Sequence, residues 1–279
     1  MLDNNLTKKI EDFVYAKPRS MQEIAKHINK NWRTADRYVE EIKKNFGTIS
    51  TQVFREGTRG ALKIAYWASV EKISHSVFQE KLEEEILRAR KKEDFSAFDI
   101  FQHAKDSSKK AKLKHSRNEE EIAVENLADL YSSTEKNLLS FSGNLSFINY
   151  KSKDKDMFKI IENLVKKGIN IKILCRVDIA SKENVEKILS LNFKYGKESI
   201  EIRHKEHPLR ATIFDSKFFH MKEIKEPTGK IHELDKKIFI SYIIRDKEWV
   251  EWLSKIFWKM FNSSIDANKR IRELDRLIK

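Results

Sequence analysis

The fold of the N-terminal part is decided by two neighbouring stretches, Ser20-Met21-Gln22-Glu23-Ile24-Ala25-Lys26-His27-Ile28 and Thr34-Ala35-Asp36-Arg37-Tyr38-Val39-Glu40-Glu41-Ile42. Ser20 and Glu23 have the spacing of a capping box, in which the serine hydroxyl accepts a first-turn N–H and the glutamate accepts the serine N–H. Apolar side chains recur at helical spacing in both stretches. The pattern predicts two short helices joined by a turn, and the small side chains of Ala25 and Ala35 let these helices cross closely.

The flanking sequence extends this pair on both sides. Apolar residues at helical spacing over 6–14 predict a preceding helix, which ends before Pro18. After a stop at Gly47, the runs 48–55 and 61–68 are rich in β-branched and aromatic residues, and they predict two strands joined by the loop Glu56-Gly57-Thr58-Arg59-Gly60. This order of elements resembles a winged helix-turn-helix, and we expect that unit to occupy residues 1–69.

The resemblance implies that the third helix enters the major groove of DNA, which is about 12 Å wide, while the hairpin acts as the wing. Residues 1–68 hold 13 basic and 8 acidic side chains, which favours double-stranded DNA as the partner over a role in protein contacts. Asn31 and Thr34 fit either helix caps or base contacts, and Trp32 fits either packing or a DNA wedge. The candidate DNA contacts are Lys30, Asn31, Trp32, Arg33, Thr34, Arg37, Arg55, Arg59 and Lys63.

Composition limits the classes of protein to which this chain can belong. The chain has 279 residues and a net charge of +13, with 35% charged and 40% hydrophobic residues, which predicts one or two domains with a real core and an anionic partner. Cys175 is the one cysteine, so an internal disulfide and a cysteine-based zinc site are excluded. We find no signal region and no run that approaches the ~18 apolar residues of a membrane span. We therefore expect a cytoplasmic protein with no membrane partner.

Metal and cofactor sites are not predicted. Four histidines, His204, His207, His220 and His232, lie in the C-terminal half without the spacing of a metal site. The chain also contains no glycine-rich phosphate-binding loop. We therefore expect neither a metal nor a cofactor.

Residues 70–118 predict a connector. Apolar residues at roughly helical spacing form a seam that we take as the first candidate for a homodimer contact, with the closing helix as the second. The members of the seam are Ile73, Val77, Leu82 and Ile86. The following segment, 103–118, is rich in lysine and poor in large apolar residues, which predicts a flexible linker.

Strand and helix patterns alternate from residue 119 onward. Strands are predicted at 137–141, 169–175, 200–204, 209–214, 217–222 and 238–244. This alternation predicts an α/β sheet with parallel strands, sandwiched by helices, over 119–262, and a basic helical tail over 263–279. We expect the fragment that begins at Glu119 to fold on its own, and we class the whole chain as mixed α and α/β.

Three features of this second part resemble the phospholipase-D-like domain of TrmB-type archaeal transcription regulators. They are the helix, glycine and strand from Glu162 to Leu174, the hairpin Arg210-Ala211-Thr212-Ile213-Phe214-Asp215-Ser216-Lys217, and the closing helix that ends Lys255-Ile256-Phe257-Trp258-Lys259-Met260-Phe261. Together with the winged helix, the resemblance covers 1–68 and 120–262. It implies a DNA-binding regulator with a sensor or dimerisation domain.

The catalytic motif of that superfamily is incomplete in this chain. Its active members need His-x-Lys-x4-Asp, in which the histidine attacks phosphorus. Counting back from Asp215, the lysine position holds Arg210 and the histidine position holds Pro208. His207 lies one residue away, and in a strand it points to the opposite face. Because proline cannot act as the nucleophile and no second copy of the motif is present, we expect no catalytic residue and no enzyme.

A small-molecule effector site is predicted at the ends of the strands. Arg210 and Asp215 can bind an anion or pair with each other, and Gly143 follows a strand at the edge where α/β sheets commonly bind ligands. The candidate effector site consists of Ser142, Gly143, Arg176, Arg210 and Asp215.

The leading hypothesis is a sequence-specific DNA-binding transcription regulator whose C-terminal domain is a catalytically inactive sensor or dimerisation domain. Two hypotheses from other classes stay open. One is a nuclease or other DNA-processing enzyme derived from the phospholipase D superfamily, and the other is a non-specific architectural DNA-binding protein. Cleavage of plasmid DNA separates the first of these from the regulator, and footprinting on one operator separates the second.

Overall fold

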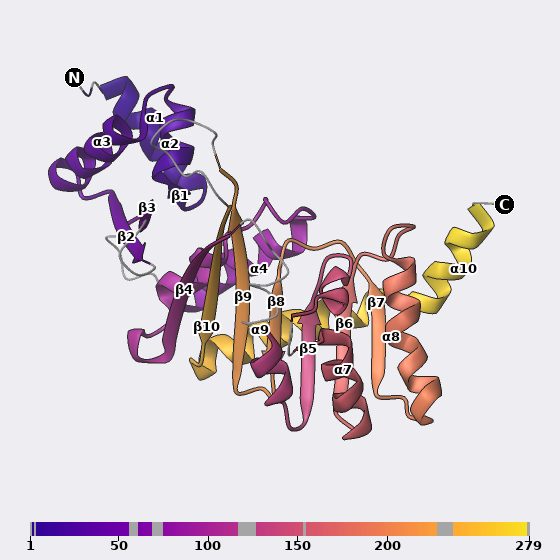
Figure 1. Cartoon of the computed structure of the whole chain (residues 1–279). Coiled ribbons are helices and arrows are strands. Elements are labelled where there is room, and N and C mark those ends of the chain that lie inside the picture. The colour runs from indigo at the N-terminus through magenta and orange to yellow at the C-terminus, as the bar shows by residue number, and fades with distance from the viewer. Residues whose placement is uncertain are drawn as a thin grey trace.

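The protein has a small N-terminal unit with a three-stranded sheet and a larger unit built on an eight-stranded sheet (Figure 1). The structure is a computed structural model that describes residues 2, 4–55, 61–68, 75–116, 127–152, 155–227 and 237–277.

The N-terminal unit confirms the predicted winged helix-turn-helix. Its helices are α1 (Asn4–Ala16), α2 (Met21–His27) and α3 (Trp32–Asn45), and its antiparallel strands lie in the order β1 (Arg19–Ser20), β3 (Ala61–Trp67) and β2 (Ile49–Arg55). The capping box forms as predicted, because the Ser20 N–H donates to a Glu23 carboxylate oxygen at 2.7 Å and the Glu23 N–H donates to the Ser20 hydroxyl at 3.3 Å. The loop 56–60 lies outside the described residues.

The larger unit confirms the predicted sheet with parallel strands. Its strand order is β11-β7-β6-β5-β8-β9-β10-β4, in which β5, β6 and β7 are parallel and the other pairs are antiparallel. The strands are β4 (Lys109–Ser116), β5 (Asn137–Phe141), β6 (Asn170–Cys175), β7 (Ile200–His204), β8 (Ala211–Phe214), β9 (Phe218–Lys225), β10 (Lys237–Ile244) and β11 (Ile265–Asp266).

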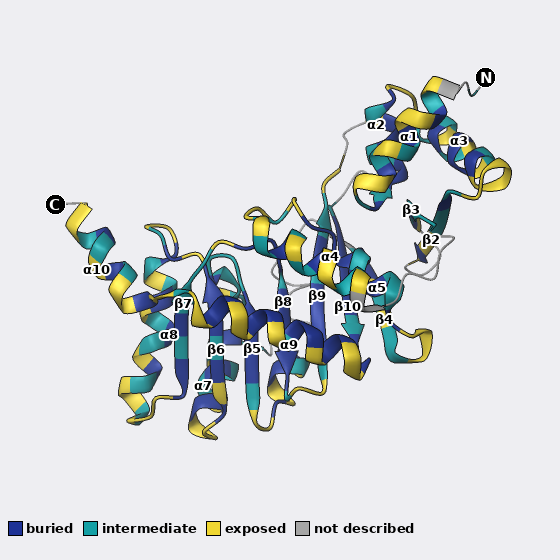
Figure 2. Ribbon diagram, turned by 180° about the vertical axis from the view of Figure 1, so that it is seen from behind, coloured by how far each residue is buried: buried dark blue, intermediate teal, exposed yellow. Residues whose placement is uncertain are grey.

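Helices cover both faces of this sheet. One face carries α4 (His75–Arg88), α5 (Ala97–His103) and α9 (Lys247–Asn262), as Figure 2 shows. The other carries α7 (Met157–Lys166) and α8 (Lys182–Tyr195) (Figure 1). The tail forms α10 (Ala267–Leu277), which confirms the predicted terminal helix.

The lysine-rich segment that we expected to be a flexible linker is instead a strand. β4 pairs antiparallel with β10 along its whole length, from Lys109 opposite Ile244 to Ser116 opposite Lys237. Its inward-facing Leu113 is buried in the main hydrophobic core, while Lys110 and Lys112 point outward and are exposed. β4 therefore has the alternating inward and outward side chains of a half-buried strand. Because most of the outward side chains are lysines, the sequence of this segment resembles that of a charged linker.

The predicted dimer seam faces the interior of its own chain. Leu82 and Ile86 on α4 are buried in the core beneath α9, and an ion pair at 2.7 Å between Lys259 and Glu83 fixes the two helices together. Val77 alone is exposed, and Ile73 lies outside the described residues. Since packing within the chain already buries this stripe, it is not a free surface for a second copy.

The wing is part of the core of the larger unit. The Phe54 ring lies about 6 Å from the rings of Phe98 and Phe101 on α5 and of Tyr242 on β10, and Leu62 belongs to the same buried cluster. The boundary that we expected between residues 118 and 119 would cut β4 away from its partner strand β10, and α5 away from the core that it shares with the sheet. We therefore withdraw the expectation that the fragment from Glu119 folds alone.

Candidate nucleic-acid interface and ligand pocket

The turn before α3 and the N-terminal half of this helix present cations to solvent. Lys30, Arg33 and Arg37 are exposed, and none of the three forms an ion pair within the described part of the chain. The opposite face of the helix packs into the winged-helix core through residues that include Ala35 and Val39. The helix therefore separates an apolar inner face from a basic outer face, as the sequence predicts.

Two of the ambiguous residues have structural contacts. The Asn31 side chain accepts the Thr34 N–H at 2.8 Å, which makes Asn31 the N-cap of α3. Trp32 is half-buried and packs against the winged-helix core, and the Arg33 guanidinium lies 5.8 Å from its ring. Asn31 and Trp32 thus hold the first turn of α3 in place, whatever else they contact.

Of the predicted wing residues, only Arg55 is exposed at a described position. Lys63 points back to α3, where its ammonium lies 2.6 Å from carboxylate oxygens of both Asp36 and Glu40. Burial lowers the pKa of Lys63, but the hydrogen bonds to these two carboxylates outweigh it and the pKa is raised. Lys63 therefore braces the wing against α3 and is not a free cation, and Arg59 lies outside the described residues.

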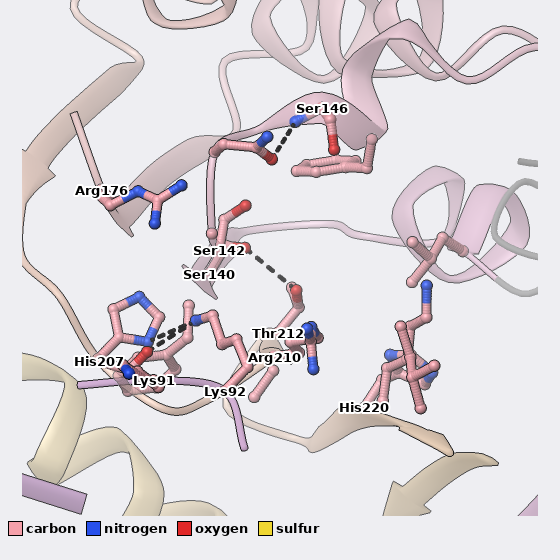
Figure 3. A pocket seen from close by; sticks show the side chains of 18 of the residues that line it. Lys91, Lys92, Ser140, Ser142, Ser146, Arg176, His207, Arg210, Thr212 and His220 are labelled. Carbon is pink, nitrogen blue, oxygen red and sulfur yellow. Dashed lines mark hydrogen bonds between the residues drawn. The ribbon is translucent and has the colours of Figure 1, made fainter. Parts of the chain in front are cut away.

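Four of the five predicted effector residues line one cavity. The cavity has a volume of about 840 Å³ and lies at the carboxyl ends of β5 and β6, beside the start of β8. Ser142, Arg176 and Arg210, which Figure 3 labels, contribute to its wall together with Gly143. The volume is within the range of sites that hold small molecules.

Asp215 is not part of this cavity, and it does not pair with Arg210. β8 separates the two residues, because Arg210 precedes the strand and Asp215 follows it. The Asp215 carboxylate accepts the backbone N–H groups of Glu135, Lys136 and Asn137 at 2.8–3.3 Å. Burial raises the pKa of Asp215, but these hydrogen bonds outweigh burial and lower it. The carboxylate therefore ties the turn between β8 and β9 to the segment that leads into β5.

Lys92 is the residue that sequence reasoning missed. It lies between α4 and α5, far from the strand ends in sequence, yet its side chain enters the same cavity. The Lys92 ammonium donates to the backbone carbonyl of His207 at 2.9 Å and lies 3.2 Å from Nδ1 of the same residue. No local pattern in the sequence marks such a contact, because it joins segments 115 positions apart.

His207 also lines the cavity, which corrects the prediction that it points to the opposite face. Residues 205–210 are irregular rather than a strand, so the alternation of faces does not apply. The ring is buried, with Nδ1 near Lys92 and Nε2 at 3.2 Å from the carbonyl of Leu174. Burial first, and then the charge of Lys92, hold the pKa of His207 well below its ordinary value. The contacts fit a neutral ring with its proton on Nε2, which leaves neither nitrogen free to attack a substrate.

The remaining walls are hydroxyl-bearing and aromatic. Thr212 links Ser140 at 3.2 Å and Tyr131 at 3.3 Å between their oxygens, and Figure 3 shows Ser140 and Thr212 joined in this way. Phe147 and Tyr150, in and after the short helix η2 (Ser146–Asn149), also line the cavity. The lining therefore includes cations, hydroxyl groups and aromatic rings.

His204, His207 and His220, the described members of the histidine set, each have hydrogen-bond partners within the protein. Nδ1 of His204 accepts the Val177 N–H at 2.9 Å, and Nε2 of His220 lies 2.7 Å from the Ser241 hydroxyl. Burial first, and then Lys222, lower the pKa of His220 to about 4. Within the described residues no group of three potential ligands gathers to hold a metal ion, and His232 lies outside them.

None of the helices in the described part of the chain is long and apolar enough to span a membrane.

Fold and surface together define a two-unit protein, a winged helix-turn-helix joined to a mixed α/β sheet unit that holds a cationic cavity. One similar solved structure is that of TrmBL2, described as an archaeal chromatin protein with a novel mode of DNA binding; the two are 14% identical, with 95% of this chain and 94% of that chain covered and a TM-score of 0.37. Another is Nuc from Salmonella typhimurium, a phospholipase D family member, at 13% identity over 57% of this chain and 97% of that one, with a TM-score of 0.39. NucT from Helicobacter pylori is similar at 15% identity over 57% of this chain and 99% of its own, also with a TM-score of 0.39. No protein-family model matches the sequence, and no curated protein matches it significantly.

Proposed function

We propose that the protein is a DNA-binding transcription regulator that reads double-stranded DNA with α3. The observation that carries this proposal is a set of exposed cations that form no ion pair within the described residues, namely Lys30 just before α3 and Arg33 and Arg37 in its N-terminal half. A helix of this kind fits the major groove, where arginine can bind guanine in bidentate fashion or hold phosphates. Arg55 extends the same basic surface onto the wing.

In this proposal the larger unit senses a ligand and catalyses no reaction. Support comes from the cavity at the strand ends, which gathers Ser142, Gly143, Arg176 and Arg210. The alternative of a nuclease lacks the nucleophile of the phospholipase D motif, because Pro208 occupies the histidine position and both ring nitrogens of the neighbouring His207 are engaged. We therefore propose an effector that binds in the cavity, and cytoplasmic action on DNA.

A homodimer belongs to the same proposal, since one winged helix reads only a short half-site and useful specificity generally needs two. Because the α4 stripe is buried, the closing helix α9 is the remaining candidate, and its Trp258 is 40% exposed. Sedimentation of the full chain at micromolar concentration tests this: a dimer that becomes a monomer in Trp258→Ser supports it, and a wild-type monomer with and without DNA contradicts it.

The test of DNA reading is a selection of bound sequences from a random duplex pool, followed by affinity measurements on the selected duplex. We expect one enriched sequence, and a loss of about 1–3 kcal/mol in binding free energy for each of Arg33→Ala and Arg37→Ala. The control is Arg272→Ala on α10, an exposed arginine at the opposite end of the molecule (Figure 1). Enrichment of no sequence, with uniform coating of DNA, would instead identify an architectural protein. Unchanged affinity in both α3 variants would show that α3 does not lie in the groove.

A further inference from the structure

Three cations from separate segments line the cavity. Lys92 comes from the segment between α4 and α5, Arg176 follows β6, and Arg210 precedes β8. Figure 3 shows the three side chains around the same space, with Ser142 between them. Within the described residues, neither Lys92 nor Arg210 has a carboxylate partner, whereas Arg176 pairs with Asp178 at 2.7 Å.

The lining as a whole is unbalanced in charge. It contains eight lysines and arginines against three glutamates, and one of these glutamates, Glu226, is already paired with Lys237 at 3.0 Å. Placing like charges together is unfavourable unless an anion neutralises them. Repulsion among these cations therefore destabilises the cavity, and a bound anion would offset the repulsion.

We propose that Lys92, Arg176 and Arg210 form a binding site for the phosphate group of a phosphorylated small molecule, whose remaining part lies against Phe147 and Tyr150. The inference rests on the proposed sensing role of this cavity and names the chemical class of its ligand.

The arrangement favours a phosphate over a carboxylate. A phosphate offers three terminal oxygens in a tetrahedral arrangement, so Arg176 and Arg210 can each find an acceptor. Lys92 contributes its charge, since its N–H groups already face the carbonyls of His207 and Leu209 and Nδ1 of His207. The two guanidinium groups supply paired donors, and the lysine supplies a point charge. The Ser142 hydroxyl on the cavity wall is a further donor for ligand oxygens.

The surroundings of Lys92 give the site a property that can be measured. Burial first, and then the charges of Arg210 and Arg176, lower the pKa of Lys92 to about 7. Other titratable groups around its ammonium are His207, Cys175 and Glu93. His207 and Cys175 are themselves held neutral, since burial keeps the pKa of the first low and raises that of the second to about 12. An anion placed beside Lys92 favours its charged form, so ligand binding above pH 7 takes up a proton on this residue.

The experiment uses the full chain with three probes, which are inorganic phosphate, adenosine 5′-monophosphate and adenosine. We expect both phosphate-bearing probes to raise the melting temperature and adenosine to leave it unchanged. Arg210→Gln weakens binding of the monophosphate by about tenfold or more, as the loss of a charge-assisted hydrogen bond implies. The control Lys167→Gln, an exposed lysine after α7, leaves binding unchanged.

Proton uptake is measured by titration calorimetry at pH 8 in two buffers of different ionisation enthalpy. We expect wild type to take up a fraction of a proton per monophosphate bound, and Lys92→Arg to bind without uptake because arginine stays charged. Stabilisation by adenosine alone, equal binding in Arg210→Gln, or no response to either phosphate probe would each overturn the inference. A protein that still loses DNA affinity in Arg33→Ala under those outcomes would leave the DNA-binding proposal standing, so the two failures are distinguishable.

Discussion

The ammonium of Lys225, at the end of β9, lies 3.1 Å from a carboxylate oxygen of Glu23, the residue that closes the capping box of α2. It lies equally close to Glu223 on its own strand, also at 3.1 Å. Burial lowers the pKa of Lys225, but Glu223 and Glu23 together raise it above its ordinary value. The ion pair therefore joins the winged helix directly to the sheet that holds the ligand cavity.

Removal of this link tests its contribution to stability. We expect Lys225→Met to lower the free energy of unfolding by about 2–4 kcal/mol, because it leaves Glu23 and Glu223 without their shared cation. Urea denaturation measures the change. The control is Lys217→Met, which breaks an exposed pair with Glu135 and is expected to cost about 0.5 kcal/mol or less. Equal effects of the two substitutions would contradict the assigned role of Lys225.

The same link sets a pH window. Burial raises the pKa of Glu23, but Lys225 and the Ser20 hydrogen bonds outweigh it, so its folded pKa lies below the ordinary 4.5. A carboxyl with a lowered pKa contributes stability above its ordinary value and loses it as pH falls through the folded value. A lysine with a raised pKa contributes below its ordinary 10.5 and loses it as pH rises further. The contribution of the pair is thus complete between about pH 5 and pH 10.

Asp99 on α5 is expected to act in the opposite direction. Burial first, and then the nearby Glu85 and Glu223, raise its pKa well above the ordinary 3.8. A raised carboxyl pKa means that the folded state disfavours the charged form, so stability falls as pH rises from 3.8. Asp99→Asn should therefore be more stable than wild type at pH 7, by about 1 kcal/mol or more, and the difference should vanish below pH 3.8. Thermal unfolding at both pH values checks this, with the exposed Asp129→Asn as control; a variant less stable at pH 7 would refute it.

Salt dependence distinguishes the two kinds of cation near α3. Each phosphate contact contributes about 0.9 to the slope of log affinity against log salt concentration. Arg37→Gln should reduce this slope by about one, whereas Lys63→Gln should leave it unchanged, because Lys63 is neutralised by Asp36 and Glu40. Fluorescence anisotropy on one duplex at several salt concentrations measures both slopes. A reduced slope in Lys63→Gln would show that Lys63 contacts DNA phosphates.

The cavity is expected to be inert toward phosphodiesters. Wild type should leave supercoiled plasmid intact with and without divalent metal ions, and His207→Ala should do the same. His207→Ala should instead lower stability by about 2 kcal/mol or more, because it empties a buried site and removes the partners of Lys92 and Leu174. Cleavage by wild type that disappears in this variant would establish an enzyme in place of the proposed regulator.

Truncation tests how the two units share a core. The fragment from Glu119 onward lacks α4, α5 and β4, and so exposes residues of the sheet that those elements cover. We expect this fragment to show no cooperative thermal transition, whereas the full chain shows one. Circular dichroism and near-ultraviolet absorbance report the two outcomes. A cooperative transition in the fragment would show that the strands after residue 137 form a sufficient core.

Local patterns predicted the winged helix well, since the capping box and the helical spacing of α2 and α3 each depend on residues a few positions apart. The strand-end rule also located Ser142, Gly143, Arg176 and Arg210, because the carboxyl ends of parallel strands meet at one edge of a sheet. The same rule says nothing of Lys92, which arrives from an earlier segment through a contact that only the tertiary fold creates. The prediction that Asp215 belongs to the effector site was wrong for a geometric reason, because β8 places it at the opposite end of the strand from Arg210.

The two-sided packing of the wing limits how this protein can change. One side of the hairpin is held to α3 by Lys63, and the other is anchored in the large core by Phe54 and Leu62. Most substitutions in these strands would therefore disturb the whole chain before they altered a preference for base pairs. Evolutionary change toward a new DNA target is thus easiest at exposed positions, in the first turns of α3 and at Arg55. A reading unit transplanted from another protein would need its own matching sheet.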